Sequence, residues 1–297
     1  MKTTLFALIV TATFVISACD VIEAPYLKNP INPADTLLKD TSDVVVKTGG
    51  VLNVLLEDYT GHTCGNCPEA AEVASAIAKK NETGRVVVVA VHAGNFALPK
   101  IPDYLYDFRT TAGTELDEVF RNSRVGLPNG LVNRVKYNGN FVLFQNNWDP
   151  ATTTQLALPP ALNLTLSHTY YDSAKTIVAT VESEYLAKGQ TDYSLVVWIV
   201  ENGIIGSQTD YRRDLKSHVK DYEFEHVLRG SLNGTWGDQL STTVEAVGSK
   251  IKKVVRYILP EEFDWKLANC ELVAYVIRKK DDQTRDVVQV VRQKFRP

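Results

Sequence analysis

From residue 51 onward, the hydrophobic pattern begins with two mostly apolar stretches separated by a pattern typical of a helix. Residues 52–59 and 86–92 are largely apolar, as strands buried on both faces are. Between them, residues 69–80 carry Ala, Val and Ile at helical spacing, and Gly84 follows. A strand, a helix and a second strand within about forty residues predict a parallel βαβ unit.

The pattern is looser up to Pro159-Pro160, which we interpret as a domain boundary. Residues 97–114 show little periodicity, and we expect an insertion there. The elements expected after it are a short helix at 116–121, a hairpin with arms at 130–134 and 140–144 and its turn at 137–139, and a closing helix at 148–158.

After Pro160 the pattern becomes that of strands alone, and residues 162–166 and 177–181 alternate with a period of two. Further strands are expected at 193–200, 254–259, 270–277 and 287–291. Short strands with Asn-Gly and Gly-Asp turns and almost no helix favour an antiparallel β-sandwich. The predicted fold class is therefore α+β with two domains, an α/β domain over residues 51–159 and an antiparallel β-sandwich over residues 160–297.

The N-terminal residues have the features of an export signal. Lys2 precedes an apolar stretch at 5–16, which is too short to span a bilayer. The stretch ends in Ile16-Ser17-Ala18-Cys19, which resembles the lipobox of bacterial lipoproteins. We therefore expect a signal peptide at 1–18, a lipid on Cys19 that binds the membrane, and a proline-containing tether at 19–50. The alternative is ordinary secretion with cleavage after Ala18.

The amino-acid composition limits the classes of binding partner that are expected for the protein. The chain has 297 residues, 44% of them hydrophobic and 23% charged, and a net charge of -3. The negative charge and the absence of a large Lys/Arg cluster argue against a nucleic acid partner. The chain has four cysteines, which are too few for a disulfide-stapled scaffold.

The motif Cys64-Gly65-Asn66-Cys67 is the strongest candidate for chemistry. It follows a predicted strand and opens a predicted helix, where free backbone N–H groups stabilise a thiolate. Pro68 is tolerated only in the first turn of a helix, so the helix should start at Cys67. We expect Cys64 to be the exposed attacking thiolate and Cys67 the inner resolving thiol.

Two other interpretations of the cysteine pair stay open. In the first interpretation, the pair is an inert structural disulfide, because exported cysteine pairs can remain oxidised. In the second, the pair is half of a zinc site, with His62, His92 or Cys270 as further ligands. No second CxxC accompanies it, so we predict neither a metal nor another cofactor.

Other titratable residues are weaker candidates. His62 is a loop histidine that could act as a base, although a structural role is the more frequent one. His218 and His226 are expected to be structural, and Cys270 to pack as a small hydrophobic residue.

The residues from Asp58 to Pro68 resemble the thioredoxin superfamily and, more closely, the Omp28-related outer membrane lipoproteins. The resemblance implies that Asp58 is a buried carboxylate that helps to deprotonate Cys67. Val125-Gly126-Leu127-Pro128 resembles the second thioredoxin signature, which implies a cis peptide bond at Pro128 and a position facing the cysteines. The resemblance also covers the lipobox and the β-rich half, including Glu225-His226-Val227-Leu228-Arg229, and so essentially the whole mature chain.

The resemblance implies a thioredoxin-like first domain in a lipid-anchored protein of the outer membrane, on its periplasmic or its cell-surface face. Two functions follow. In the first, Cys64 and Cys67 exchange thiols and disulfides with exported proteins. In the second, the protein is a non-catalytic binding or adhesion lipoprotein, in which the sandwich binds a surface protein. Thr63 and Asn66 depart from the thioredoxin pattern, so the sequence leaves open whether the protein is an enzyme.

Overall fold

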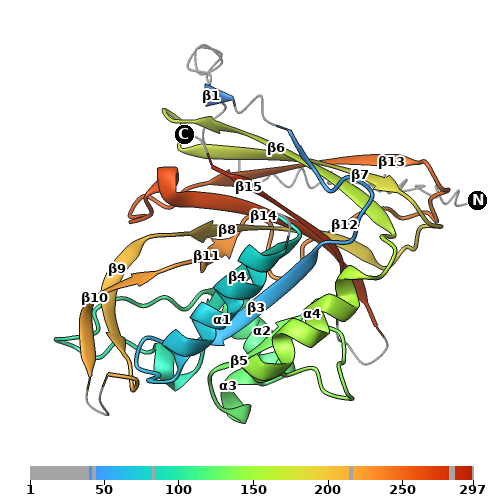
Figure 1. Ribbon diagram of the computed structural model, residues 1–297. Helices are drawn as coiled ribbons and strands as arrows, with labels where there is room; N and C mark the ends of the chain where they lie inside the picture. Colours follow the sequence, from blue (N-terminus) through green and yellow to red (C-terminus); the bar gives the residue numbers. More distant parts are fainter. Residues whose placement is uncertain (1–39, 42–44, 82–83, 214–216, 281–284, 296–297) are drawn as a thin grey trace, which may run out of the picture. The chain divides into compact units, whose positions relative to one another are not determined.

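The first half of the chain forms the expected strand–helix–strand unit. The computed structural model describes residues 40–41, 45–81, 84–213, 217–280 and 285–295, all of which belong to one unit formed by residues 32–297 (Figure 1). Strand β3 (Val54–Thr60) leads to helix α1 (Cys67–Lys80) and strand β4 (Val86–His92), and β3 pairs with β4 in parallel. Helix α1 begins at Cys67 and has Pro68 in its first turn, as predicted. The predicted signal peptide, Cys19 and most of the predicted tether lie outside the described residues.

The remaining elements of the first half differ from the expected ones mainly in their bounds. They are η2 (Asn95–Ala97), α2 (Thr111–Phe120), α3 (Asn122–Val125), β5 (Asn129–Val132), η3 (Gln145–Asn147) and α4 (Trp148–Leu156). Helix α2 begins five residues earlier than predicted, because the Thr110 hydroxyl accepts a hydrogen bond from the Gly113 N–H and caps it.

The predicted second arm of the hairpin, residues 140–144, is not a strand in the described chain. It makes only an isolated bridge between Gly130 and Leu143 and another between Tyr137 and Asn140. The Leu143 carbonyl also accepts a hydrogen bond from the indole N–H of Trp148, which draws this segment toward α4.

The second half is almost entirely β, and each of its six predicted strands is present and longer than predicted. Its strands are β6 (Leu162–Tyr171), β7 (Thr176–Tyr185), β8 (Tyr193–Glu201), β9 (Ile204–Thr209), β10 (His218–Phe224), β11 (Val227–Ser231), β12 (Asp238–Gln239), β13 (Lys250–Ile258), β14 (Cys270–Lys279) and β15 (Arg285–Lys294). A short helix, η4 (Leu267–Asn269), precedes β14. Strands β9 to β12 were not predicted, because their sequences are more polar and carry little alternation.

One large sheet extends across the predicted boundary at residue 160. Its strand order is β15-β14-β8-β11-β4-β3-β5, and β12 pairs with β8. The junction is a parallel pairing of β11 with β4, at Val227 and Ala90. A second sheet has the order β1-β6-β7-β13, with β1 (Asp40–Thr41) at its edge and β2 (Val46–Lys47) paired to β6. The fold is therefore mixed α/β with strands predominating, whereas the two-domain division remains a prediction.

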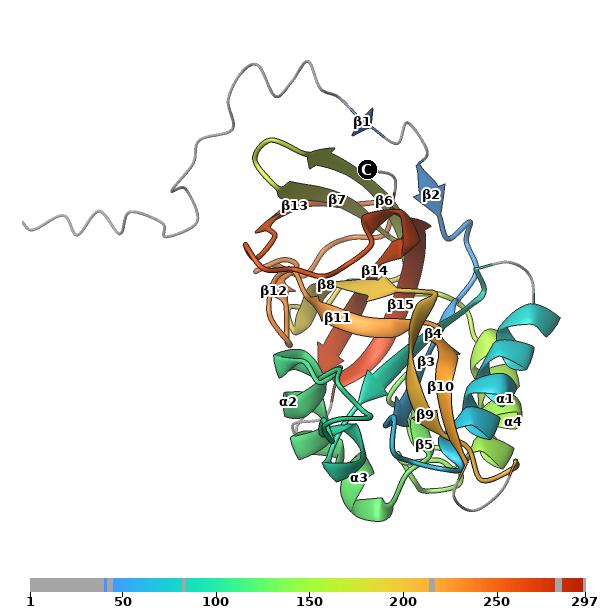
Figure 2. The same ribbon diagram turned by 90° about the vertical axis from the view of Figure 1, so that its left-hand side faces the viewer.

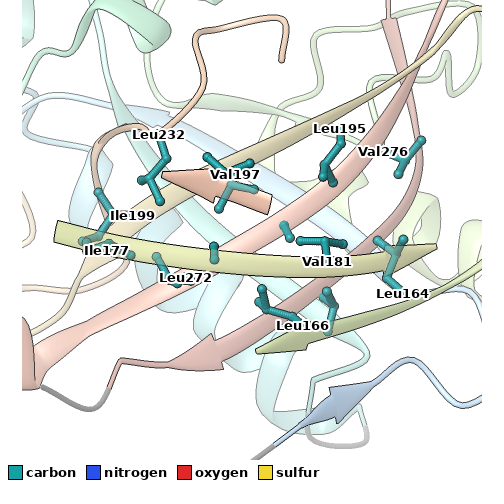
Figure 3. Packing of buried hydrophobic residues seen from close by; sticks show 14 of the residues in the cluster. Leu164, Leu166, Ile177, Val181, Leu195, Val197, Ile199, Leu232, Leu272 and Val276 are labelled. Atoms are coloured by element: carbon teal, nitrogen blue, oxygen red, sulfur yellow. The ribbon is translucent and has the colours of Figure 1, made fainter. Parts of the chain in front are cut away.

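The core is arranged on the two faces of the large sheet. Leu195, Val197 and Ile199 of β8 point into a cluster shared with β6 and β7, and Figure 3 shows this cluster, with Ile199 beside Ile177 of β7. The alternate residues of β8 point into a second cluster that includes side chains of β3, β4 and α2. On the side opposite α2, α1 and α4 cover β3 and β4 in a third cluster. The second cluster connects the βαβ unit to the C-terminal strands.

Candidate functional site

The cysteine motif lies in the turn between β3 and α1, and its two sulfurs form a disulfide. The Cys64–Cys67 S–S distance is 2.05 Å. The turn is closed by hydrogen bonds from the Cys64 N–H to the Gly61 carbonyl (3.0 Å) and from the Cys67 N–H to the Cys64 carbonyl (3.3 Å). This geometry follows from the sequence, since the buried strand ends at Thr60 and Pro68 permits a helix only from this point.

The expectation that Cys64 is exposed is wrong in this structure. Cys64 is 3% exposed and Cys67 2%, so the two are almost equally buried. The cause is the antiparallel hairpin of β9 and β10, which reaches the turn that carries the cysteines (Figure 2).

Three hydrogen bonds join this hairpin to the turn. The Thr209 N–H donates to the His62 carbonyl, and the Tyr211 N–H donates to the Gly65 carbonyl, both at 2.9 Å. The Gln208 side-chain amide donates to the Cys64 carbonyl at 2.9 Å. Residues almost 150 positions away in the sequence thus hold the backbone of the disulfide turn.

The close packing around the turn explains why positions 61 and 65 are glycines. A Cβ atom on Gly65 would lie 2.3 Å from the Tyr211 ring, and one on Gly61 would lie 2.5 Å from the backbone of Phe96. The Phe96 carbonyl also accepts hydrogen bonds from the backbone N–H (3.1 Å) and the hydroxyl (3.0 Å) of Thr63. The turn is therefore held from one side by the hairpin and from the other by the 95–104 segment.

Asp58 is buried in β3, six residues before Cys64. It is 1% exposed, and within the described residues its Oδ1 atom has no hydrogen-bond partner. Burial raises the pKa of this carboxyl to about 7. Asp58 lines a cavity of about 500 Å³ between α1 and β10, together with Ser75, Tyr222 and His226. A carboxyl with this pKa can gain or lose a proton near neutral pH.

Pro128 lies at the same end of the sheet as the disulfide turn. The Leu127–Pro128 peptide bond is cis, in agreement with the expectation, and Pro128 is buried. Strand β5 begins at the next residue, and Asn129 pairs with Tyr59 near the end of β3. The topology therefore places the proline beside the strand that leads to Cys64.

His62 and His92 belong to an aromatic cluster. The Nε2–H of His62 donates to the Leu98 carbonyl at 2.9 Å, and its ring stacks on Tyr104 at 5.4 Å. Burial lowers the pKa of His62, and it lowers that of His92 to about 3. His92 packs 4.8 Å from Phe108. Within the described residues, no group of three or more His, Cys, Asp or Glu side chains is placed to hold a metal ion.

The other candidates are distant from the disulfide or have packing roles. Cys270 lies in the core between the two sheets, where burial raises the pKa of its thiol to about 12. His218 stacks on Tyr104 at 4.9 Å. His226 has a positive φ of 59°, and its carbonyl accepts a hydrogen bond from the Ala90 N–H at the junction of β4 and β11.

Gln208 and Tyr211 were not predicted, because the residues around them match no motif. The Asn202-Gly203 turn indicated a reversal between β8 and β9 and gave no signal for the β9–β10 hairpin itself. Its position over the cysteines depends on contacts that are long-range in sequence.

The fold and this site together define a mixed α/β protein with a buried disulfide at a strand–helix turn. The sequence profile of a family described as "Outer membrane protein Omp28" matches residues 116–297. The match includes more than half of the chain, and the chain therefore belongs to the Omp28 family of outer membrane proteins, which also identifies the outer membrane as its location. The matched residues do not include the Cys64–Cys67 turn. None of the described helices is long and apolar enough to cross a membrane.

Two solved structures from Porphyromonas gingivalis are similar to the chain. HBP35 covers 83% of this chain and 76% of its own, at 15% identity and a TM-score of 0.59, which is a likeness of fold. A domain of the outer membrane lipoprotein Omp28 covers 46% of this chain and 90% of its own, at 23% identity and a TM-score of 0.28. No curated protein matches the sequence.

Proposed function

We propose that the protein carries out thiol–disulfide exchange on exported proteins through Cys64 and Cys67, and that its first half is a thioredoxin-like domain. The observation that carries the proposal is the buried carboxyl of Asp58 on the strand that leads into the disulfide turn, whose Oδ1 atom has no hydrogen-bond partner among the described residues. A buried carboxyl oxygen without a hydrogen-bond partner is costly, and groups with strongly shifted pKa values are concentrated at functional sites. The cis bond at Pro128, at the same end of the sheet, supports the same interpretation.

The proposed reaction starts from the reduced pair. The Cys64 thiolate attacks one sulfur of a protein disulfide, which forms a mixed disulfide and releases the other sulfur as a thiolate. Cys67 then gives its proton to Asp58 and attacks the Cys64 sulfur, which releases the second substrate thiol. Two electrons pass to the substrate, and the pair ends as the Cys64–Cys67 disulfide.

The location of this activity follows from the proposed anchor. We propose that residues 1–18 are removed, that Cys19 carries the lipid, and that residues 19–50 connect it to domains at 51–159 and 160–297. Exported proteins with thiols or disulfides are the partners on the periplasmic or the cell-surface face.

An insulin reduction assay with dithiothreitol as the reductant tests the proposal. The wild-type protein is expected to accelerate the precipitation of insulin chains, and the Cys64→Ser variant is expected to leave the uncatalysed rate unchanged. Cys270→Ser is the matched control and should retain the wild-type rate. Equal rates for the wild type and Cys64→Ser would disprove exchange activity.

A second candidate function is binding of a surface protein without catalysis. The observation that favours it is the burial of both cysteines beneath the β9–β10 hairpin. In that case the disulfide only stabilises the turn between β3 and α1. The thioredoxin-like half is then a scaffold, and the β-sandwich contacts the ligand. Loss of Cys64 would then reduce stability and leave ligand binding intact.

A further inference from the structure

The segment from Gln208 to Tyr211 runs from the end of β9 into a turn, and two of its backbone N–H groups bind the cysteine turn without forming a strand ladder. Residues 209 and 211 are two positions apart, so their N–H groups point to the same side of an extended chain. These two groups donate to the carbonyls of His62 and Gly65. Proteins that bind extended peptides use the same main-chain hydrogen bonds.

This segment belongs to the hairpin tip, which is held mainly by polar contacts that include a hydrogen bond between the Thr209 and Tyr104 hydroxyls, whereas the hairpin base packs in an apolar cluster. At the base, Ile204 and Phe224 are buried in a cluster with Phe108 and Val227. At the tip, the Arg212 guanidinium pairs with Glu72 of α1 at 2.7 Å, but both side chains are substantially exposed, so the ion pair is weak. Elements held by few apolar contacts open locally at a low cost in free energy.

Disulfide exchange requires access to a sulfur atom, whereas this arrangement buries both cysteines. An incoming thiolate has to reach a sulfur of the disulfide, so the rate depends on access. Both cysteines are at most 3% exposed. The Tyr211 ring lies directly against Gly65, a residue that stands between the two cysteines in the sequence. The Gln208 side chain holds the Cys64 carbonyl in addition.

We propose that residues 208–211 occupy the docking place of an extended, cysteine-containing polypeptide, and that the hairpin tip leaves this place before the disulfide reacts. This inference rests on the proposed exchange function and names its substrate class. The incoming polypeptide donates its own backbone N–H groups to the carbonyls of His62 and Gly65. This is the reverse of the resolving step described above: the polypeptide's thiolate attacks the Cys64 sulfur and forms a mixed disulfide, and Cys67 leaves as a thiolate and takes up a proton.

The first experiment measures how fast dithiothreitol reduces the Cys64–Cys67 disulfide in the folded protein. In this reaction, dithiothreitol is oxidised to its cyclic disulfide and the cysteine pair becomes two thiols, which are counted by alkylation and mass spectrometry. The double variant Gln208→Ala/Tyr211→Ala is expected to react about tenfold faster than the wild type, because it opens more readily. The control is Ile205→Ser on the same hairpin, where Ile205 is 51% exposed, and it should react at the wild-type rate.

Equal reduction rates in the wild type, the double variant and the control would overturn the proposal. Circular dichroism shows whether the double variant is folded, and a variant that is unfolded is replaced by the single variants Gln208→Ala and Tyr211→Ala. Each single variant is expected to react severalfold faster than the wild type, and wild-type rates in both would also overturn the proposal.

The second experiment tests the substrate class with a synthetic peptide that has the sequence of residues 205–213. Added at millimolar concentration, the peptide is expected to slow reduction of the double variant by at least twofold, because it refills the docking place. A peptide with the same residues in scrambled order is the control and should have no effect. Equal effects of the two peptides would overturn the assignment of an extended polypeptide.

Both experiments measure access to the disulfide and not turnover. If the double variant is rapidly reduced and still does not accelerate insulin reduction, the proposed exchange function fails and the role of the hairpin stands. If the wild type accelerates insulin reduction and the hairpin variants match it in both rates, the exchange function stands and the inference fails.

Discussion

Glu57 and Arg134 form a bidentate ion pair in which neither side chain has any exposed surface. Arg134 Nε lies 2.8 Å from Oε2 of Glu57, and Nη2 lies 2.9 Å from Oε1. The same Nη2 donates to the Tyr275 hydroxyl at 3.1 Å, and the guanidinium lies 5.6 Å from the centre of the Trp198 ring. The pair therefore connects β3 to strands β8 and β14 of the second half.

Removal of Arg134 alone should be strongly destabilising. Arg134→Met leaves the Glu57 carboxylate buried without a charge partner, and we expect a loss of about 3–5 kcal/mol in the free energy of unfolding. Urea denaturation measures this loss. The control Arg109→Met breaks the partly exposed ion pair with Asp107, and its loss should stay below about 1 kcal/mol. A similarly small loss for Arg134→Met would show that the buried pair is not a structural requirement.

Asp58 should make the protein less stable as the pH rises toward neutrality. Its pKa is raised from 3.8 to about 7 by burial, so the folded state binds a proton that the unfolded state has already released. Its contribution to stability is complete below about pH 4 and is lost as the pH rises through 7. The loss is on the order of 4 kcal/mol, since one pKa unit corresponds to about 1.4 kcal/mol.

The Asp58→Asn variant tests this dependence, because its side chain does not titrate. Urea denaturation at pH 5 and pH 8 should show a smaller decrease in stability for Asp58→Asn than for the wild type. The exposed Asp221 provides the control, and Asp221→Asn should keep the wild-type pH dependence. If Asp58→Asn also keeps it, the carboxyl is ionised in the folded protein. In the proposed exchange reaction, the variant should also resolve the mixed disulfide more slowly.

The contact between Gly65 and Tyr211 should not tolerate an added methyl group. Gly65→Ala places a Cβ atom 2.3 Å from the ring, and we expect a loss of about 1–3 kcal/mol in stability from overpacking. The combination with Tyr211→Ala should recover part of this loss, which thermal denaturation of the three variants would measure. Gly230→Ala is the control, since its nearest neighbour would be 4.0 Å away. Additive losses in the double variant would contradict a direct contact.

The proposed lipid anchor predicts the fractionation of the protein. The Cys19→Ser variant cannot be acylated, and it should move from the membrane fraction to the soluble fraction. Immunoblots of the two fractions measure the change, and Cys270→Ser serves as a control that should remain in the membranes. A Cys19→Ser protein that still sediments with the membranes would contradict lipid attachment at this residue.

Much of the local structure follows from local patterns. The apolar residues of β3 and β4 and the helical spacing of α1 predicted the βαβ unit, and Pro68 fixed the start of α1 at Cys67. The six predicted strands of the second half are present because alternation in β6 and β7 and the largely apolar sequences of β8 and β14 are local signals. The prediction of a strand at 140–144 was wrong, because the hydrogen bond between the Leu143 carbonyl and the Trp148 indole competes with strand pairing.

The sequence by itself thus determined where β3, α1 and β4 lie, and that the cysteine pair stands at a strand–helix turn. Only the tertiary structure decided that β11 pairs with β4, so that one sheet extends across residue 160. Only the tertiary structure decided, too, that Gln208 and Tyr211 bury the cysteines. The physical reason is that these contacts join segments far apart in the sequence and use backbone N–H and carbonyl groups, which every residue carries, so no local motif marks them.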